Sequence, residues 1–135
     1  MPIIIFILSL IIPDNSQTFS KIDIILERHN EVIMEVMKGE SQFKENARNE
    51  NDGGSLSLGC LQFKWKTFHE KAKKFQLFTG LDSADWQNRW ADCWSQKLVM
   101  AYMLEYEDKP LCHWQNTSCN VRNYLCGEEK TICNK

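Results

Sequence analysis

Residues 39–63, GESQFKENARNENDGGSLSLGCLQF, hold the features from which the fold and the chemistry of this chain can be predicted. Glu40 follows a segment with helical apolar periodicity, so we expect it at the C-terminal end of a helix. There the negative pole of the helix dipole disfavours the carboxylate form, and apolar neighbours would do the same by desolvation. Both effects raise the pKa of a glutamate, which a general acid working near neutral pH requires.

A β-hairpin is expected after this helix, facing Glu40. Residues 52–54, DGG, are a strong turn signal, and residues 55–58, SLSL, alternate as a strand does. Between the helix and the turn the chain is polar. Three carboxylates of this part are candidates for a second acidic group, although Asp52 is also expected to serve the turn: Glu45, Glu50 and Asp52.

The order and spacing of these residues resemble the active-site segment of the lysozyme superfamily. Glu40-Ser41, the DG turn and Gly59-x-Leu61-Gln62 are similar to the E-S…G-L-M-Q pattern of soluble lytic transglycosylases and to the E-S-x-F…D-G-S…G-x-L-Q pattern of chicken-type lysozymes. The chicken-type pattern has an Asp two residues before the Gly of G-x-L-Q, where this chain has a serine. The resemblance is therefore closer to soluble lytic transglycosylases and goose-type lysozymes, in which one glutamate acts as acid and then as base.

The resemblance implies a mostly α fold of the α+β lysozyme-like kind, with a small β-hairpin beside an active-site cleft. Glu40 would be the catalytic acid and base, and Ser41 and Gln62 would orient it or the substrate. Ser57 would hydrogen-bond the sugar where other enzymes have their carboxylate, and Asp52 would belong to the substrate site. The implied substrate is peptidoglycan or a related N-acetylhexosamine polymer, cleaved at the MurNAc-GlcNAc β-1,4 bond to leave a 1,6-anhydromuramic end.

Three other functions stay open. A hydrolase on the same fold would use a water held by Asp52 or Glu50. A secreted, disulfide-stabilised glycan-binding protein or inhibitor would have kept the fold and lost catalysis, but it would not need the intact pair Glu40-Ser41. A cysteine-rich effector or toxin with a chance motif is the third, and the Y-N-A motif common in transglycosylases is not visible downstream.

The N-terminal residues have the composition of an export signal. Residues 3–12, IIIFILSLII, are too short to span a bilayer as a helix and fit a signal-peptide apolar region, although no Lys or Arg precedes them. Small residues before Lys21 suit a cleavage site. We therefore predict a signal peptide at residues 1–20 and a secreted, periplasmic or extracellular domain at residues 21–135, without stable membrane insertion once the leader is removed.

Cysteine usage agrees with export, because an even number of cysteines in a short secreted chain favours disulfides. Four of them recur every seven residues in a tail from about residue 111, which we expect to be irregular and pinned to the body. No C-x-x-C motif occurs, the three histidines are scattered, and no nucleic-acid signature is present, so we predict a monomer without metal or cofactor. The six cysteines are Cys60, Cys93, Cys112, Cys119, Cys126 and Cys133.

Hydrophobic periodicity predicts three helices. The first begins at Lys21 with Ser20 as its N-cap and extends toward Gly39. The second begins near Trp65 and ends at residues 79–80, and the longest runs from residue 82 or 83 to about Tyr106.

Four side chains on these helices have predicted environments. His29 lies on an apolar stripe, and we expect it to be partly buried with one hydrogen bond rather than catalytic. Trp90 and Trp94, four residues apart, are expected in the core. Cys93 is expected to pair with Cys60 or with the tail.

Overall fold

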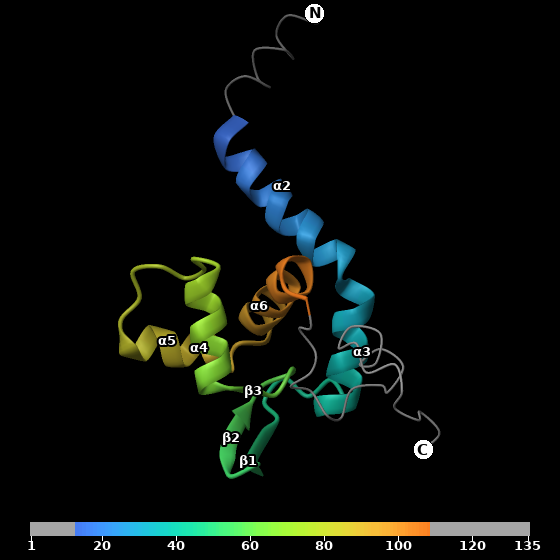
Figure 1. Ribbon diagram of the computed structural model, residues 1–135, viewed down its shortest axis with the longest axis vertical. Coiled ribbons are helices and arrows are strands. Elements are labelled where there is room, and N and C mark those ends of the chain that lie inside the picture. The colour runs from blue at the N-terminus through green and yellow to red at the C-terminus, as the bar shows by residue number, and fades with distance from the viewer. Residues whose placement is uncertain (1–12, 109–135) are drawn as a thin grey trace, which may run out of the picture.

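The computed structural model describes residues 13–108, with side chains from residue 21 onward. Most of the predicted export signal and the cysteine-rich tail lie outside the described residues. Figure 1 shows α2 and α3 along one side, α4 and α5 along the other, α6 between them, and the sheet at one end. The elements are α2 (Pro13–Arg28), α3 (Asn30–Ser41), β1 (Arg48–Asp52), β2 (Ser55–Leu58), β3 (Phe63–Lys64), α4 (Trp65–Lys74), α5 (Ser83–Ala91) and α6 (Cys93–Tyr106).

The predicted fold class, mostly helical with a small β-sheet, is confirmed. The sheet is antiparallel with the order β1-β2-β3. Gly53 and Gly54 connect β1 to β2 and both have positive φ angles, 61° and 83°, as a two-residue hairpin turn requires. The third strand was not predicted, because a strand of two residues has no periodicity to detect.

The core forms around α6, which contacts α2, α3, α4 and α5. This helix is apolar on nearly all sides, and residues 98–101 and Met103 are buried in it. A helix without a polar face is stable only when its neighbours cover it. Two other helices supply large side chains to the same core, Phe68 from α4 and Ile33 from α3.

The prediction of one helix starting at Lys21 is wrong. Helix α2 begins at Pro13 and runs through Ser20, which is therefore inside a helix and not an N-cap. The chain bends at His29 before α3 begins. His29 is partly buried and its Nε2 lies 2.9 Å from Glu105 Oε1 of α6, as predicted for this residue.

The longest predicted helix begins and ends as expected but is broken at Asp92. This residue has an extended backbone, ends α5, and caps α6 by accepting hydrogen bonds from the N–H and the hydroxyl of Ser95 at 2.9 and 2.7 Å. Because α6 starts in a new direction, Trp90 and Trp94 do not share a face. Trp90 is buried and donates from Nε1 to the carbonyl of Phe63 at 2.8 Å, whereas Trp94 is 48% exposed, so its predicted place in the core is wrong.

Helix α4 is also shorter than predicted. It ends at Lys74, and the chain then passes through Gln76 and Phe78, which both have positive φ angles. The N–H of Leu77 returns to the carbonyl of Ala72 at 2.8 Å. The apolar residues that suggested a longer helix instead cover the core from an irregular segment, since Leu77 and Phe78 pack against it.

The contact between α6 and the bend at His29 gives a pH-dependent prediction. Hydrogen bonds from His29 and then Arg28 hold the pKa of Glu105 below its ordinary value of 4.5. A carboxylate with a lowered folded-state pKa stabilises the fold above pH 4.5 and loses that contribution as the pH falls through the folded-state value. We expect Glu105→Gln to lower the melting temperature at pH 7, and the difference from wild type to disappear in strong acid.

Thermal unfolding followed by circular dichroism at both pH values measures this difference. Glu35→Gln, which changes an exposed glutamate of α3, is the matched control and should have little effect at either pH. A melting-temperature difference for Glu105→Gln that is the same at both pH values would contradict the assignment.

Candidate functional site

A cleft of about 390 Å³ lies between the C-terminal end of α3 and the β-hairpin. The expectation that the hairpin faces the end of this helix is therefore correct. Four of the five predicted site residues line the cleft, and only Ser57 does not. The described residues that line it are Gly39, Glu40, Ser41, Gln42, Lys44, Ala47, Arg48, Asn49, Asp52 and Gln62.

Glu40 is the second-to-last residue of α3 and is partly exposed on the cleft. Directly after the helix, Gln42 and Phe43 both adopt left-handed backbone conformations, with φ angles of 53° and 64°. Residues other than glycine adopt this conformation at a cost of about 1–2 kcal/mol each. The N–H groups of both residues point back to the carbonyl of Met37. This costly double turn directs the chain from the helix toward the hairpin, so Glu40 and the hairpin form opposite walls.

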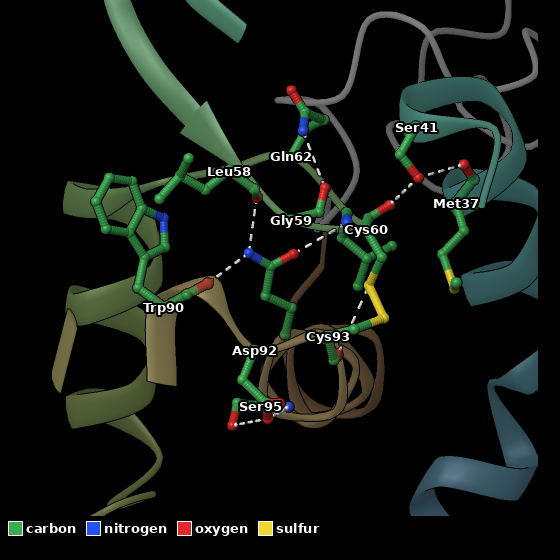
Figure 2. The surroundings of a disulfide bond; sticks show 12 residues. Met37, Ser41, Leu58, Gly59, Cys60, Gln62, Trp90, Asp92, Cys93 and Ser95 are labelled. Carbon is green, nitrogen blue, oxygen red and sulfur yellow. Dashed lines mark hydrogen bonds between the residues drawn. A yellow bond between two sulfur atoms is a disulfide. The ribbon is translucent and has the colours of Figure 1, made fainter. Parts of the chain in front are cut away.

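Ser41 is buried and fixes the end of the helix to the rest of the site. Its hydroxyl lies 2.7 Å from the carbonyl oxygen of Cys60 and 3.1 Å from that of Met37, and it donates to them (Figure 2). Because these backbone contacts occupy its single proton, Ser41 holds the helix end in place and does not donate to a ligand.

Gln62 lies on the loop between β2 and β3 and has a φ angle of 53°. Its side-chain Nε2 donates to the carbonyl of Gly59 at 2.9 Å, and its backbone N–H donates to the same carbonyl at 3.2 Å. Figure 2 shows the side-chain oxygen pointing away from this loop. Gln62 also lines the cleft, although most of the residue is buried.

The loop that carries Gln62 is anchored to α6 by a disulfide and by one glutamine. Cys60 is bonded to Cys93, which is one of the two pairings expected for Cys93. Gln96 is fully buried; its Oε1 accepts the N–H of Leu61 at 2.9 Å, and its Nε2 donates to the carbonyls of Leu58 and Trp90 (Figure 2). Every polar atom of the Gln96 amide group is therefore used to hold this loop.

Asp52 and Ser57 form a pair in the hairpin. Ser57 is completely buried and its hydroxyl donates to Asp52 Oδ2 at 2.5 Å. Ser57 is therefore not the direct sugar contact that the resemblance implied, since its side chain lies behind Asp52. Asp52 lines the cleft, whereas Glu50 is exposed and bound to Arg48. Of the three candidate second carboxylates, Asp52 is the one that lines the cleft.

The cleft also includes Lys44, Arg48 and Asn49, to which the sequence analysis assigned no individual site role. They lie in the polar segment between the helix and the turn, where composition alone indicates only solvated loop residues. Arg48 and Asn49 lie shortly before the DG turn, on β1. This spacing is the feature of the sequence from which their place in the site could have been predicted. Lys44 and Arg48 add positive charge to a cleft that also contains two carboxylates.

Comparison of this chain with protein-family models, with curated proteins and with solved structures gives no match. Within residues 13–108, no three His, Cys, Asp or Glu side chains are grouped so that they could hold a metal ion. No helix in this part of the chain is long and apolar enough to cross a membrane. A function is therefore inferred from the chemistry of the cleft and from the resemblance of residues 40–62.

The geometry around Gln96 gives a prediction about the anchored loop. Gly59 has a φ angle of 84°, and an added Cβ would overlap the side-chain amide of Gln96. We expect Gly59→Ala to destabilise the fold by about 3 kcal/mol or more, from backbone strain and overpacking together. Gly54→Ala is the matched control, because Gly54 has a φ angle of 83° but nothing within 4 Å of an added Cβ.

Urea unfolding of both variants measures the two free energies of unfolding. Gly54→Ala should cost only the backbone strain, about 1 kcal/mol. Equal losses in the two variants would contradict the tight packing of Gly59 against Gln96.

Proposed function

We propose that this protein cleaves the β-1,4 bond between N-acetylmuramic acid and N-acetylglucosamine in peptidoglycan, or the same bond in a related N-acetylhexosamine polymer. The observation that carries the proposal is the cleft, which is lined by Glu40, Asp52 and Gln62, three residues that the resemblance had selected. Glu40 is the general acid and then the general base. The resemblance to lytic transglycosylases and goose-type lysozymes supports this assignment.

Cleavage of a glycosidic bond requires an acid for the leaving oxygen and a nucleophile for the anomeric carbon. Glu40 gives its proton to the leaving oxygen, and the substrate's 2-acetamido group assists at the anomeric carbon. The muramic 6-hydroxyl then bonds to that carbon and returns a proton to Glu40. No water is consumed in this transglycosylase reaction, and the product has a 1,6-anhydromuramic end.

A lysozyme-type hydrolase is the second candidate, and one observation favours it. Asp52 lines the cleft and accepts a hydrogen bond from Ser57. A carboxylate held in this way can bind a water molecule that replaces the 6-hydroxyl as nucleophile. The product would then have an ordinary reducing end.

The charges of the cleft support peptidoglycan as the substrate. Lys44 and Arg48 line the cleft, and peptidoglycan carries carboxylates on its peptides and on those lactyl groups that bear no peptide, whereas chitin is neutral. The Cys60–Cys93 disulfide supports export, because structural disulfides persist in oxidising compartments. The proposal is thus a secreted or periplasmic, monomeric enzyme without a cofactor.

Replacement of Glu40 tests this proposal. We expect Glu40→Gln to lower the rate of peptidoglycan cleavage by roughly 10²–10⁴-fold, since the amide cannot donate the catalytic proton. Glu45→Gln is the matched control, because Glu45 is an exposed glutamate five residues away that does not line the cleft. Mass spectrometry of the soluble products measures the rate and identifies the ends.

The products also separate the alternatives. Anhydromuropeptides that vanish in Glu40→Gln support the transglycosylase, and reducing ends support the hydrolase. A folded wild type that yields no product contradicts both enzymes, and retained peptidoglycan binding would then favour the non-catalytic binding protein.

A further inference from the structure

An irregularity in the hairpin decides which side Asp52 faces. Asn49 pairs with Ser57, and Asp52 pairs with Ser55, so two residues of β1 lie opposite one residue of β2. Side chains alternate along a regular strand, and residues three apart would point to opposite faces. The extra residue of a bulge restores the same face. Asn49 and Asp52 therefore both line the cleft.

The bulge is closed by a local hydrogen bond, from the N–H of Asn51 to Asn49 Oδ1 at 3.1 Å. Ser57 lies opposite Asn49 on β2, and its hydroxyl is fully buried. A buried hydroxyl needs a partner, and here the partner is the Asp52 carboxylate. A carboxylate accepts several hydrogen bonds, so the bond from Ser57 leaves acceptor capacity for a molecule in the cleft.

We propose that Ser57 is a positioning residue that holds the Asp52 carboxylate toward the cleft, where Asp52 binds the water for hydrolysis. This inference rests on the proposed function in its hydrolase form, because it concerns the water that replaces the 6-hydroxyl as nucleophile. Glu40 gives one proton to the leaving oxygen. The water held by Asp52 then bonds through its oxygen to the anomeric carbon and returns one proton to Glu40. Ser57 touches neither substrate nor water. Through Asp52 it nevertheless sets the share of cleaved bonds that end in a reducing end rather than in a 1,6-anhydro end.

Packing of the core does not by itself require a hydroxyl group at residue 57. Its neighbours along β2, Leu56 and Leu58, are half-buried and pack against the apolar cluster, while Ser57 itself is fully covered. An apolar residue there would satisfy packing as well as serine does. The hydroxyl is explained by its acceptor, Asp52, and not by burial.

The test compares Ser57→Ala with Ser57→Thr, which keeps the hydroxyl, and with Ser55→Ala. Ser55 is the matched control, because it is an exposed serine of the same strand paired with Asp52 through the backbone. We expect Ser57→Ala to lower kcat for reducing-end products about tenfold or more with little change in KM, and to raise the share of 1,6-anhydro ends. Ser57→Thr should recover most of the hydrolysis, and Ser55→Ala should behave as wild type.

A second variant covers the case in which Ser57→Ala fails to fold. Asp52→Asn preserves the shape of the site but binds water less well, and it should shift the products in the same direction. Hydrolysis in Ser57→Ala or Asp52→Asn equal to that of Ser55→Ala overturns the inference.

An independent readout separates this inference from the proposed function. The ¹³C signal of the Asp52 carboxyl group should move in Ser57→Ala and stay in place in Ser55→Ala. If the wild type cleaves no glycan, the proposed function and the role of Asp52 in hydrolysis both fail. The carboxyl signal then shows whether Ser57 positions Asp52 at all, and an unmoved signal overturns that part as well.

Discussion

One buried side chain, Gln96, joins the helical core to the loop that forms part of the cleft. Residues 59–61 are buried although they belong to no helix or strand, and buried backbone must find hydrogen-bond partners. Gln96, in the first turn of α6, supplies one for the N–H of Leu61 and also donates to the carbonyls of Leu58 and Trp90. The loop can approach the amide group this closely because residue 59 is glycine. The position of the cleft wall therefore depends on a polar contact inside an otherwise apolar core.

Cys60 extends this connection to the other wall. Its sulfur is bonded to α6 through Cys93, and its carbonyl accepts the hydroxyl of Ser41 at the end of α3. One residue thus links the helix that carries Glu40 to the helix at the centre of the core. The resemblance pairs Glu40 with Ser41. In the structure the hydroxyl of Ser41 fixes the position and direction of the C-terminal end of α3.

Local structure was predictable from the sequence wherever a short segment determines its own backbone conformation. The two glycines after Asp52 specify the hairpin, and the ends of α3 and α6 fall where the apolar periodicity stops. Breaks within a periodic segment were not predictable. Trp90 and Trp94 have helical spacing, yet Asp92 between them is a helix cap, and a solvent-facing aspartate inside a helix looks the same in sequence. The bend at His29 is hidden for the same reason, because the apolar stripe continues across it.

For the site, too, the sequence indicated which residues take part but not how their side chains are oriented. The resemblance selected Glu40 and Gln62 as site residues, and both line the cleft, each beside a residue or turn with a positive φ angle. The resemblance implied a sugar contact for Ser57, but the sequence does not show that this side chain is fully buried and bonded to Asp52. Asp52 illustrates the limit most clearly. Counting residues from Asn49 puts it on the far face, and only the bulge returns it to the cleft. Two serines thus fix the two walls of the cleft in different ways: Ser41 ties the end of α3 to the carbonyl of Cys60, and Ser57 donates to the Asp52 carboxylate.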